Sequence, residues 1–141
     1  MADERRRPTK TTVVDTVYSD FKTGFSVHPV KKDLVLDTNR DSVKRSIKNI
    51  VQTNYYERPF KPTFGGNITG FLFENLTVPT LSVIRDTLTM AINNYESRAI
   101  VHDIQLSDVL DSNHLACKIV FSTKTGGDQQ DFVDVILERV R

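Results

Sequence analysis

Apolar residues recur at helical spacing in two stretches of the chain. In the first, they fall at i, i+4, i+7 and i+8, which places four of them on one helical face: Val43, Ile47, Ile50 and Val51. Thr38 and Asp41, just before this run, have the spacing of a capping box. We therefore predict a helix that begins near Thr38. Its basic residues lie largely off the apolar face, and form either a solvated side or a docking side for an acidic partner.

The second stretch runs from Val78 to Tyr95. Pro79 suits the first helical turn, where the N–H that proline lacks has no partner within the helix. A stripe of apolar residues predicts burial of one face against a core: Leu81, Ile84, Leu88, Ala91, Ile92 and Tyr95. A shorter helix is expected over residues 68–73, because Leu72 follows Ile68 by four residues.

The last third of the chain has the period of two that is typical of strands. One face of the first predicted strand carries Ile100, His102, Ile104 and Leu106. One face of the second carries Leu115, Cys117, Ile119 and Phe121. The third, from Phe132 to Leu137, is almost continuously apolar, so we expect it to be covered on both faces. The links "DVLDSN" and "TKTGGDQQ" are short and rich in turn residues, which favours an antiparallel meander.

Helices followed by a sheet indicate the α+β class. We predict two to three helices packed on a small antiparallel C-terminal sheet, with an extended N-terminal arm. Residues 1–20 are expected to be a flexible or partner-ordered arm, and residues 21–141 a single domain. The arm is basic at its start, which leaves open a contact with an acidic partner or nucleic acid. Residues 24–37 contain two extended runs interrupted by Pro29, as in an edge hairpin or an extended arm.

Composition narrows the classes of partner. The 141 residues include 19 basic and 18 acidic side chains, for a net charge of +1, so overall charge gives no reason to expect a nucleic acid partner. No apolar run reaches transmembrane length and no secretory h-region is visible, so we expect no membrane partner. Cys117 is the only cysteine, which excludes an intrachain disulfide.

Motifs for catalysis are weak. S-x-x-K at residues 19–22 and K-T-G at residues 124–126 echo the serine β-lactamase signature, but the chain is too short for that fold. The histidines lack metal-ligand spacing: His28, His102 and His114. The carboxylates considered for glycoside hydrolysis each have a basic residue nearby: Glu57, Glu74 and Glu96. We predict no catalytic residue, no metal site and no cofactor.

Two segments remain with a high density of unusual residues. Residues 54–75 hold six aromatic side chains, two prolines and three glycines. We interpret them as an irregular connector with polar contacts through Arg58 and Glu74, pinned to the helices by apolar anchors: Tyr55, Phe60, Phe64, Phe71 and Phe73. Glu96 and Arg98 follow the second long helix. They form either an ion pair or cap at the helix end, or a contact with another subunit.

Three pieces in order carry a family resemblance: "VKRSIKNIVQTNYYERPFKPTFGGNITGFLFEN", the helix end "NNYESR" and a short terminal sheet. Over roughly residues 25–141 the chain resembles the baseplate wedge and sheath-initiator family of contractile phage tails, the lysozyme-like baseplate family, which has relatives in type VI secretion baseplates. The family triplet after the helix is Glu-Pro-Arg. Here it reads Glu96-Ser97-Arg98, which removes a rigid turn residue.

The resemblance implies a structural virion protein without catalytic activity, located in the tail baseplate and assembled in the host cytoplasm. It implies docking on the helical core of the wedge and templating of sheath polymerisation by strand addition. The implied partners are other wedge proteins and the tail sheath protein, with tail tube or hub proteins as further candidates and six copies per baseplate. The family triplet corresponds to Glu96 and Arg98. With the connector and the last strand added from our own interpretation of the residues, the predicted partner-binding residues are Glu96, Arg98, Arg58, Phe132, Val133, Val135 and Leu137. The alternatives are the equivalent subunit of a bacterial contractile injection or type VI secretion system, and a small muralytic enzyme.

Overall fold

A computed structural model describes residues 17–74, 76–109, 114–124 and 129–138. The elements follow in the order β1 (Ser19–Phe21), β2 (Leu36–Thr38), α1 (Asn39–Gln52), α2 (Thr69–Leu72), α3 (Val78–Tyr95), β3 (Ala99–Val109), β4 (His114–Thr123) and β5 (Gln130–Glu138). Most of the predicted arm, and part of each predicted turn, lie outside the described residues. The α+β class is confirmed.

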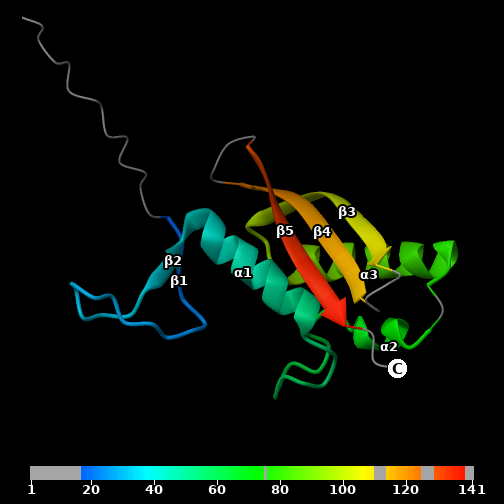
Figure 1. The fold of residues 1–141 in the computed structure, drawn as a ribbon, viewed down its shortest axis with the longest axis horizontal. Helices are drawn as coiled ribbons and strands as arrows, with labels where there is room; N and C mark the ends of the chain where they lie inside the picture. The colour runs from blue at the N-terminus through cyan, green and yellow to red at the C-terminus, as the bar shows by residue number, and fades with distance from the viewer. Residues whose placement is uncertain (1–16, 75, 110–113, 125–128, 139–141) are drawn as a thin grey trace, which may run out of the picture.

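The three C-terminal strands form an antiparallel sheet in the order β3-β4-β5, as the meander prediction required. α3 packs on β3 and lies behind the sheet in Figure 1, whereas α1 runs beside β5 and also contacts α3. β1 and β2 form a separate antiparallel pair ahead of α1, with a bridge between Val27 and Leu34. This hairpin extends away from the body (Figure 1).

The core lies between the two long helices and one face of the sheet. Its largest fully buried side chains come from α1, α3, β3 and β4, with Ile68 from the connector: Phe121, Ile47, Ile50, Ile68, Ile84, Leu88, Ile92, Ile104, Leu115, Ile119, Val43 and Val51. Full burial of a side chain of this kind stabilises the fold by about 1.5–3 kcal/mol before entropy is counted. The apolar faces predicted for α1 and β4 are thus confirmed, as is that of α3 from Leu81 to Ile92, whereas Tyr95 at the end of its stripe is 37% exposed.

The predicted face of β3 is wrong in its first half. A β-bulge between Val101 and Asp103 leaves His102 outside the pairing register, and an extra residue reverses the alternation of side chains. Val101 therefore packs against the core, while Ile100 is 45% exposed. His102 Nε2 lies 2.9 Å from Ser122 Oγ, so its ring has a hydrogen-bond partner within the sheet.

The prediction that β5 is covered on both faces is also wrong. Val133 and Val135 are buried, but Phe132 and Ile136 on the outer face are 52% and 66% exposed. The exposure of these two side chains shows that β5 is covered on its inner face only.

The capping box predicted at Thr38 is absent. Thr38 has the backbone of an N-cap, but its side chain makes no cap hydrogen bond. It is also the last residue of β2, where it pairs with Ser19. At α3 it is Thr77 that caps the helix, accepting a hydrogen bond from the Thr80 N–H. Pro79 lies in the first turn of α3 as predicted.

Candidate interaction surfaces

Glu96 and Arg98 form an ion pair at the junction of α3 and β3. The Arg98 Nε and Nη2 atoms each donate a 2.7 Å hydrogen bond to the Glu96 carboxylate, and the Arg98 backbone N–H donates a third at 3.2 Å. The Glu96 side chain is only 3% exposed. Burial opposes ionisation of this carboxyl, but the hydrogen bonds and charge of Arg98, with a hydrogen bond from Ser46, outweigh it and hold the pKa of Glu96 below its ordinary value.

Arg98 also reaches the N-terminal segment. Its Nη1 lies 3.3 Å from Ser42 Oγ and 3.6 Å from Asp20 Oδ2, and its guanidinium lies 5.2 Å from the centre of the Tyr18 ring. Ser42 in turn donates a hydrogen bond to Asp20. The hydrogen bonds and nearby charges raise the pKa of Arg98, the Glu96 hydrogen bond most of all. This guanidinium therefore ties the α3–β3 junction to α1 and to the root of the hairpin.

Of the two interpretations of Glu96 and Arg98, the ion pair is present within the chain. Arg98 remains 26% exposed, so part of its side chain is still at the surface. The sequence analysis missed Tyr18, Asp20 and Ser42. No local motif could have found them, since Asp20 and Arg98 are far apart in the chain and meet only through the fold.

The connector is pinned by fewer aromatic residues than predicted. Phe64 is buried, and the centre of its ring lies 4.8 Å from the centre of the Tyr95 ring. The Arg58 guanidinium lies over the Phe64 ring, 3.9 Å from its centre. Phe71 packs partly on the core. The other three predicted anchors are exposed instead, Phe60 fully, because the chain turns them outward: Tyr55, Phe60 and Phe73.

The proposed strand residues divide between the two faces of β5. Val133 and Val135 belong to the core and Leu137 packs partly against it, so their side chains are occupied within the chain. Phe132 is exposed and lies under the Lys118 ammonium, which is 4.7 Å from its ring centre. The exposed Ile136 is a surface residue that the sequence analysis missed, because a continuous apolar run does not reveal which face is covered.

β5 is the last strand of its sheet, and among the described residues its outer edge pairs with no further strand. The Phe132 N–H donates a 2.8 Å hydrogen bond to Asp131 Oδ1, and the same oxygen lies 2.7 Å from Lys44 Nζ of α1. The Phe132 N–H thus points toward α1 and away from β4. Since backbone groups of a strand alternate in direction, the N–H groups of Asp134 and Ile136 point the same way.

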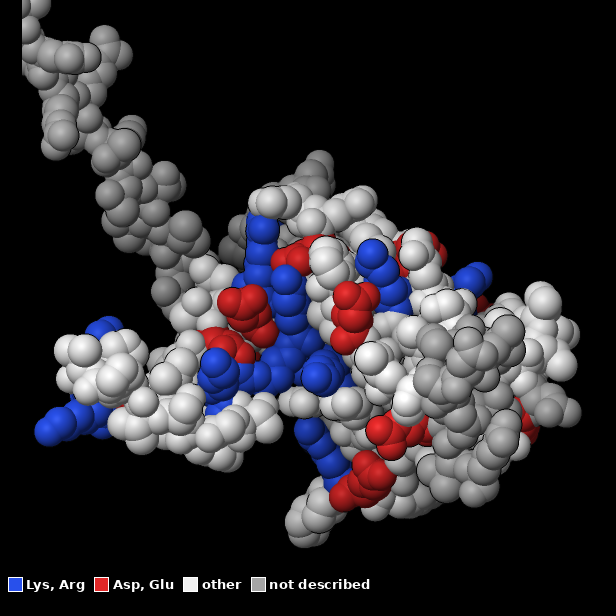
Figure 2. All heavy atoms as spheres, viewed as in Figure 1, with Lys and Arg blue, Asp and Glu red and all other residues white. Residues whose placement is uncertain are grey.

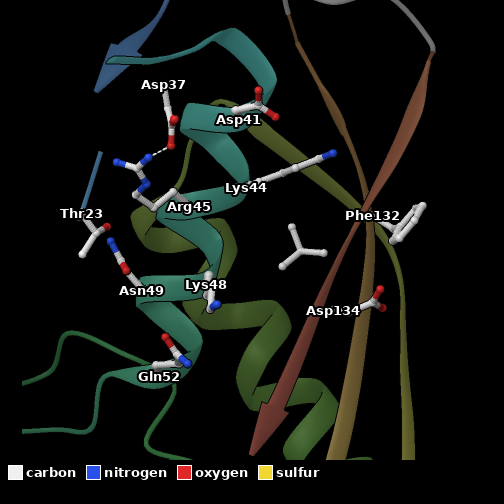
Figure 3. Close-up of a pocket in the computed structure, with 11 residues that line it drawn as sticks. Thr23, Asp37, Asp41, Lys44, Arg45, Lys48, Asn49, Gln52, Phe132 and Asp134 are labelled. Atoms are coloured by element: carbon white, nitrogen blue, oxygen red, sulfur yellow. Dashed lines mark ion pairs between the residues drawn. The ribbon is translucent and has the colours of Figure 1, made fainter. Parts of the chain in front are cut away.

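A groove of about 700 Å³ runs beside this edge. Its lining comes from the hairpin, α1 and β5: Thr23, Asp37, Asp41, Lys44, Arg45, Lys48, Asn49, Gln52, Phe132, Val133 and Asp134. Figure 3 shows Lys44 extending from α1 toward β5, with Phe132 and Asp134 beyond the strand and Arg45 paired with Asp37. Lys and Arg side chains gather over α1 on this face (Figure 2).

The described residues hold no group of three or more His, Cys, Asp or Glu side chains placed to bind a metal ion. Within the same residues, no helix combines the length and hydrophobicity needed to cross a membrane. Three surface features stand out in the described part of the chain: the open sheet edge with its groove, the projecting hairpin and the charged cluster at Arg98.

The structure defines a small α+β domain, and comparisons with known proteins assign it to a family. The family model described as "Baseplate wedge protein gp25" matches residues 37–126, and the chain belongs to this family. Its relative in Enterobacteria phage T4, named "Baseplate wedge protein gp25", is 29% identical over 117 residues, which cover 77% of this chain and 82% of the relative. The protein is thus a baseplate wedge component of a contractile tail or related injection system.

Two solved structures share the fold. A Geobacter sulfurreducens protein named as a "putative tail lysozyme" has a TM-score of 0.69 at 20% identity, covering 76% of this chain and 96% of that one. A chain of the anti-feeding prophage baseplate has a TM-score of 0.59 at 18% identity, covering 88% of this chain and 87% of that one. The resemblance to the baseplate family expected from sequence is confirmed.

Proposed function

We propose that this subunit docks on the wedge core through the region around Glu96 and Arg98, and that it templates sheath polymerisation by accepting a strand at the free edge of β5. An incoming strand gains affinity from backbone hydrogen bonds and specificity from alternating side chains. In the proposed assembly six copies surround the tail axis within the virion, after assembly in the host cytoplasm, and the tube or hub proteins are further neighbours.

The observation that carries the proposal is the outward direction of the backbone at the β5 edge. The Phe132 N–H faces the groove beside α1, and the alternation of the strand extends this to Asp134 and Ile136. An uncovered edge of this kind accepts a further strand and is a hazard in a protein that stays alone. Phe132 and Ile136, both exposed, offer cross-strand contacts on the outer face.

Docking through Glu96 and Arg98 would use the part of the guanidinium that the internal pair leaves uncovered. Arg98 makes two bonds with Glu96 and stays 26% exposed, so a partner carboxylate or carbonyl could add to the cluster without breaking the pair. The exposed Arg58, held over Phe64, provides a second cationic contact on the neighbouring connector.

We propose no catalytic activity, although the Geobacter relative carries a lysozyme name. A glycosidase needs a carboxylic acid with a raised pKa. Here the pKa of Glu96 is lowered mainly through Arg98, against its burial, and the pKa of Glu57 is lowered by hydrogen bonds from the Asn54 backbone and side chain. Release of muropeptides from purified cell wall by the purified chain, lost in Glu57→Gln, Glu74→Gln or Glu96→Gln, would favour the muralytic alternative.

Asp134→Pro tests strand addition at β5. Proline lacks an N–H, and position 134 directs that group away from β4, so the isolated fold should persist while the edge can no longer pair fully. We expect purified baseplates that contain the variant but carry no sheath in negative-stain images. Asp134→Ala, which keeps the N–H and removes only the carboxylate, should give normal sheaths. Full-length sheaths on Asp134→Pro particles would contradict templating at this edge.

The equivalent role in a bacterial injection system remains the second candidate, favoured by the fold shared with the anti-feeding prophage baseplate chain. The same edge would then receive the sheath of that apparatus. Purification of the assembled particle, followed by imaging for a capsid, distinguishes a phage tail from an injection system.

A further inference from the structure

The N-terminal hairpin exposes an unusual amount of apolar surface. Between Val17 and Thr38, six large apolar side chains are at least 46% exposed: Val17, Phe21, Phe25, Val27, Val30 and Leu36. Isolated apolar residues are normal on a surface, but a concentration in one small element marks an interaction site. The family model begins at residue 37, so this exposed surface precedes the segment that the model matches.

The root of the hairpin is held firmly on the body. Arg45 of α1 pairs with Asp37 and donates a hydrogen bond to the Phe21 carbonyl. Arg98 and Ser42 contact Asp20, as described above. A two-stranded ribbon is marginal on its own, and these contacts fix its direction relative to α1. Figure 1 shows the remainder projecting from the body.

The tip is shaped by His28. Its Nδ1 accepts hydrogen bonds from the backbone N–H groups of Val30 and Lys31, each at 3.2 Å. The Lys32 N–H donates to the His28 carbonyl at 2.9 Å, and the His28 N–H donates to the Asp33 carbonyl at 2.7 Å. An Nδ1 that accepts requires the tautomer with its proton on Nε2. The turn is therefore organised before any partner binds.

The free part of the hairpin is also positive. Residues 21–36 hold three lysines and one aspartate, whereas the acids at the root, Asp20 and Asp37, are neutralised by arginines of the body. No carboxylate among the described residues forms an ion pair with Lys22, Lys31 or Lys32. In Figure 2 the outer end of this lobe shows Lys or Arg atoms around white atoms. Apolar surface rimmed by cations complements apolar surface rimmed by carboxylates.

We propose that this hairpin is a pre-organised docking arm that inserts its apolar tip into a cleft of another baseplate protein, and that carboxylates at the rim of that cleft pair with Lys31 and Lys32. The arm would place the subunit in the assembly before any sheath strand arrives. A protein cleft is favoured over a lipid surface because the chain belongs to a family of baseplate components.

Cross-linking with a water-soluble carbodiimide tests the rim chemistry, because the reagent joins a lysine amine to a carboxylate in direct contact. We expect peptide mapping of the assembled baseplate to find Lys31 or Lys32 linked to Asp or Glu of a different protein. Links confined to this chain, or none, would overturn the proposal.

Two double variants and two His28 variants of the full chain test the arm itself, with Lys61→Glu as the control. The double variant Lys31→Glu/Lys32→Glu should lower incorporation into baseplates about tenfold or more, which corresponds to a binding free energy of roughly 1.4 kcal/mol. The double variant Val27→Ser/Val30→Ser should lower incorporation by a similar factor. Lys61→Glu, which reverses an exposed lysine on the connector, is the matched control. His28→Ala should also weaken incorporation, and His28→Asn should restore it because the amide oxygen can cap the same turn. Wild-type incorporation of the two double variants would refute the docking arm.

The outcomes separate this inference from sheath templating. Hairpin variants should be missing from the baseplate, whereas Asp134→Pro should be present in baseplates that lack sheath. Sedimentation with phosphatidylglycerol vesicles provides the lipid arm of the test. If the lysine variants lose vesicle binding while incorporation is unchanged, the hairpin is a membrane contact and the proposal is wrong.

Discussion

The Arg98 guanidinium holds the buried Glu96 carboxylate through two hydrogen bonds of 2.7 Å across a single intervening residue. Glu96 ends α3 and Arg98 precedes β3, so the pair fixes the corner between helix and sheet. Ser97 lies between them, at the position where the family resemblance led us to expect proline. The bidentate pair therefore forms in this chain without a proline ring between its two partners.

Removing Arg98 should destabilise the isolated protein as well as any interface. In Arg98→Met the Glu96 carboxylate remains buried without its partner, so we expect a loss of about 2–4 kcal/mol in the free energy of unfolding. The double variant Glu96→Gln/Arg98→Met should lose less than the two single variants together, with a coupling of about 1–3 kcal/mol. Urea unfolding measures all four proteins. Unchanged stability of Arg98→Met, with loss of incorporation into baseplates, would instead make Arg98 a partner contact only.

Stability should fall in acid through the same pair. The folded-state pKa of Glu96 lies below the ordinary 4.5, so the unfolded chain takes up the proton first as pH falls. The contribution of Glu96 is present well above pH 4.5 and is lost as pH falls through the lowered pKa. Unfolding in urea at a series of pH values should show a steeper acid loss for the wild type than for Glu96→Gln. Parallel profiles would mean that other carboxyls, such as Asp131, account for the loss.

Two glycines of the connector should respond oppositely to alanine. Gly65 has φ +115°, and a Cβ there would lie 2.1 Å from the Thr53 carbonyl oxygen. Gly65→Ala should therefore cost at least about 2 kcal/mol. Gly70 in α2 has open space around the added carbon, so Gly70→Ala should stabilise the protein by up to about 1 kcal/mol. Thermal unfolding measures the sign of each change in stability. Equal shifts in the melting temperature of the two variants would contradict the role assigned to the backbone of Gly65.

Alanine substitutions at two phenylalanines four residues apart should also differ strongly in their effect on stability. Phe64→Ala removes a buried ring that contacts Tyr95 and Arg58, with an expected cost of about 3 kcal/mol. Phe60→Ala removes a fully exposed ring and should change stability by no more than about 0.5 kcal/mol. Denaturant unfolding of the two variants compares them directly, and a large loss in Phe60→Ala would show that its ring packs on the body.

The elements with strong local signals were predictable. α3 has the bounds that its apolar stripe and Pro79 indicated, and the alternation in β4 placed Leu115 to Phe121 in the core. These patterns are visible in the sequence because a helix or strand that is buried on one face needs an apolar side chain at each position of that face, which recurs with a fixed period. The family was also readable from sequence, since its motifs lie in order along the chain.

The sequence by itself thus determined the class of fold, the helices and the inward face of β4. The tertiary structure decided the rest: the bulge that reverses the face of β3, the exposure of Phe132 and Ile136, and the meeting of Arg98 with Asp20. The type of an apolar residue does not reveal whether it faces the core or a partner. An ion pair between distant segments produces no periodic pattern in the sequence. Only packing in three dimensions chooses which surfaces stay open.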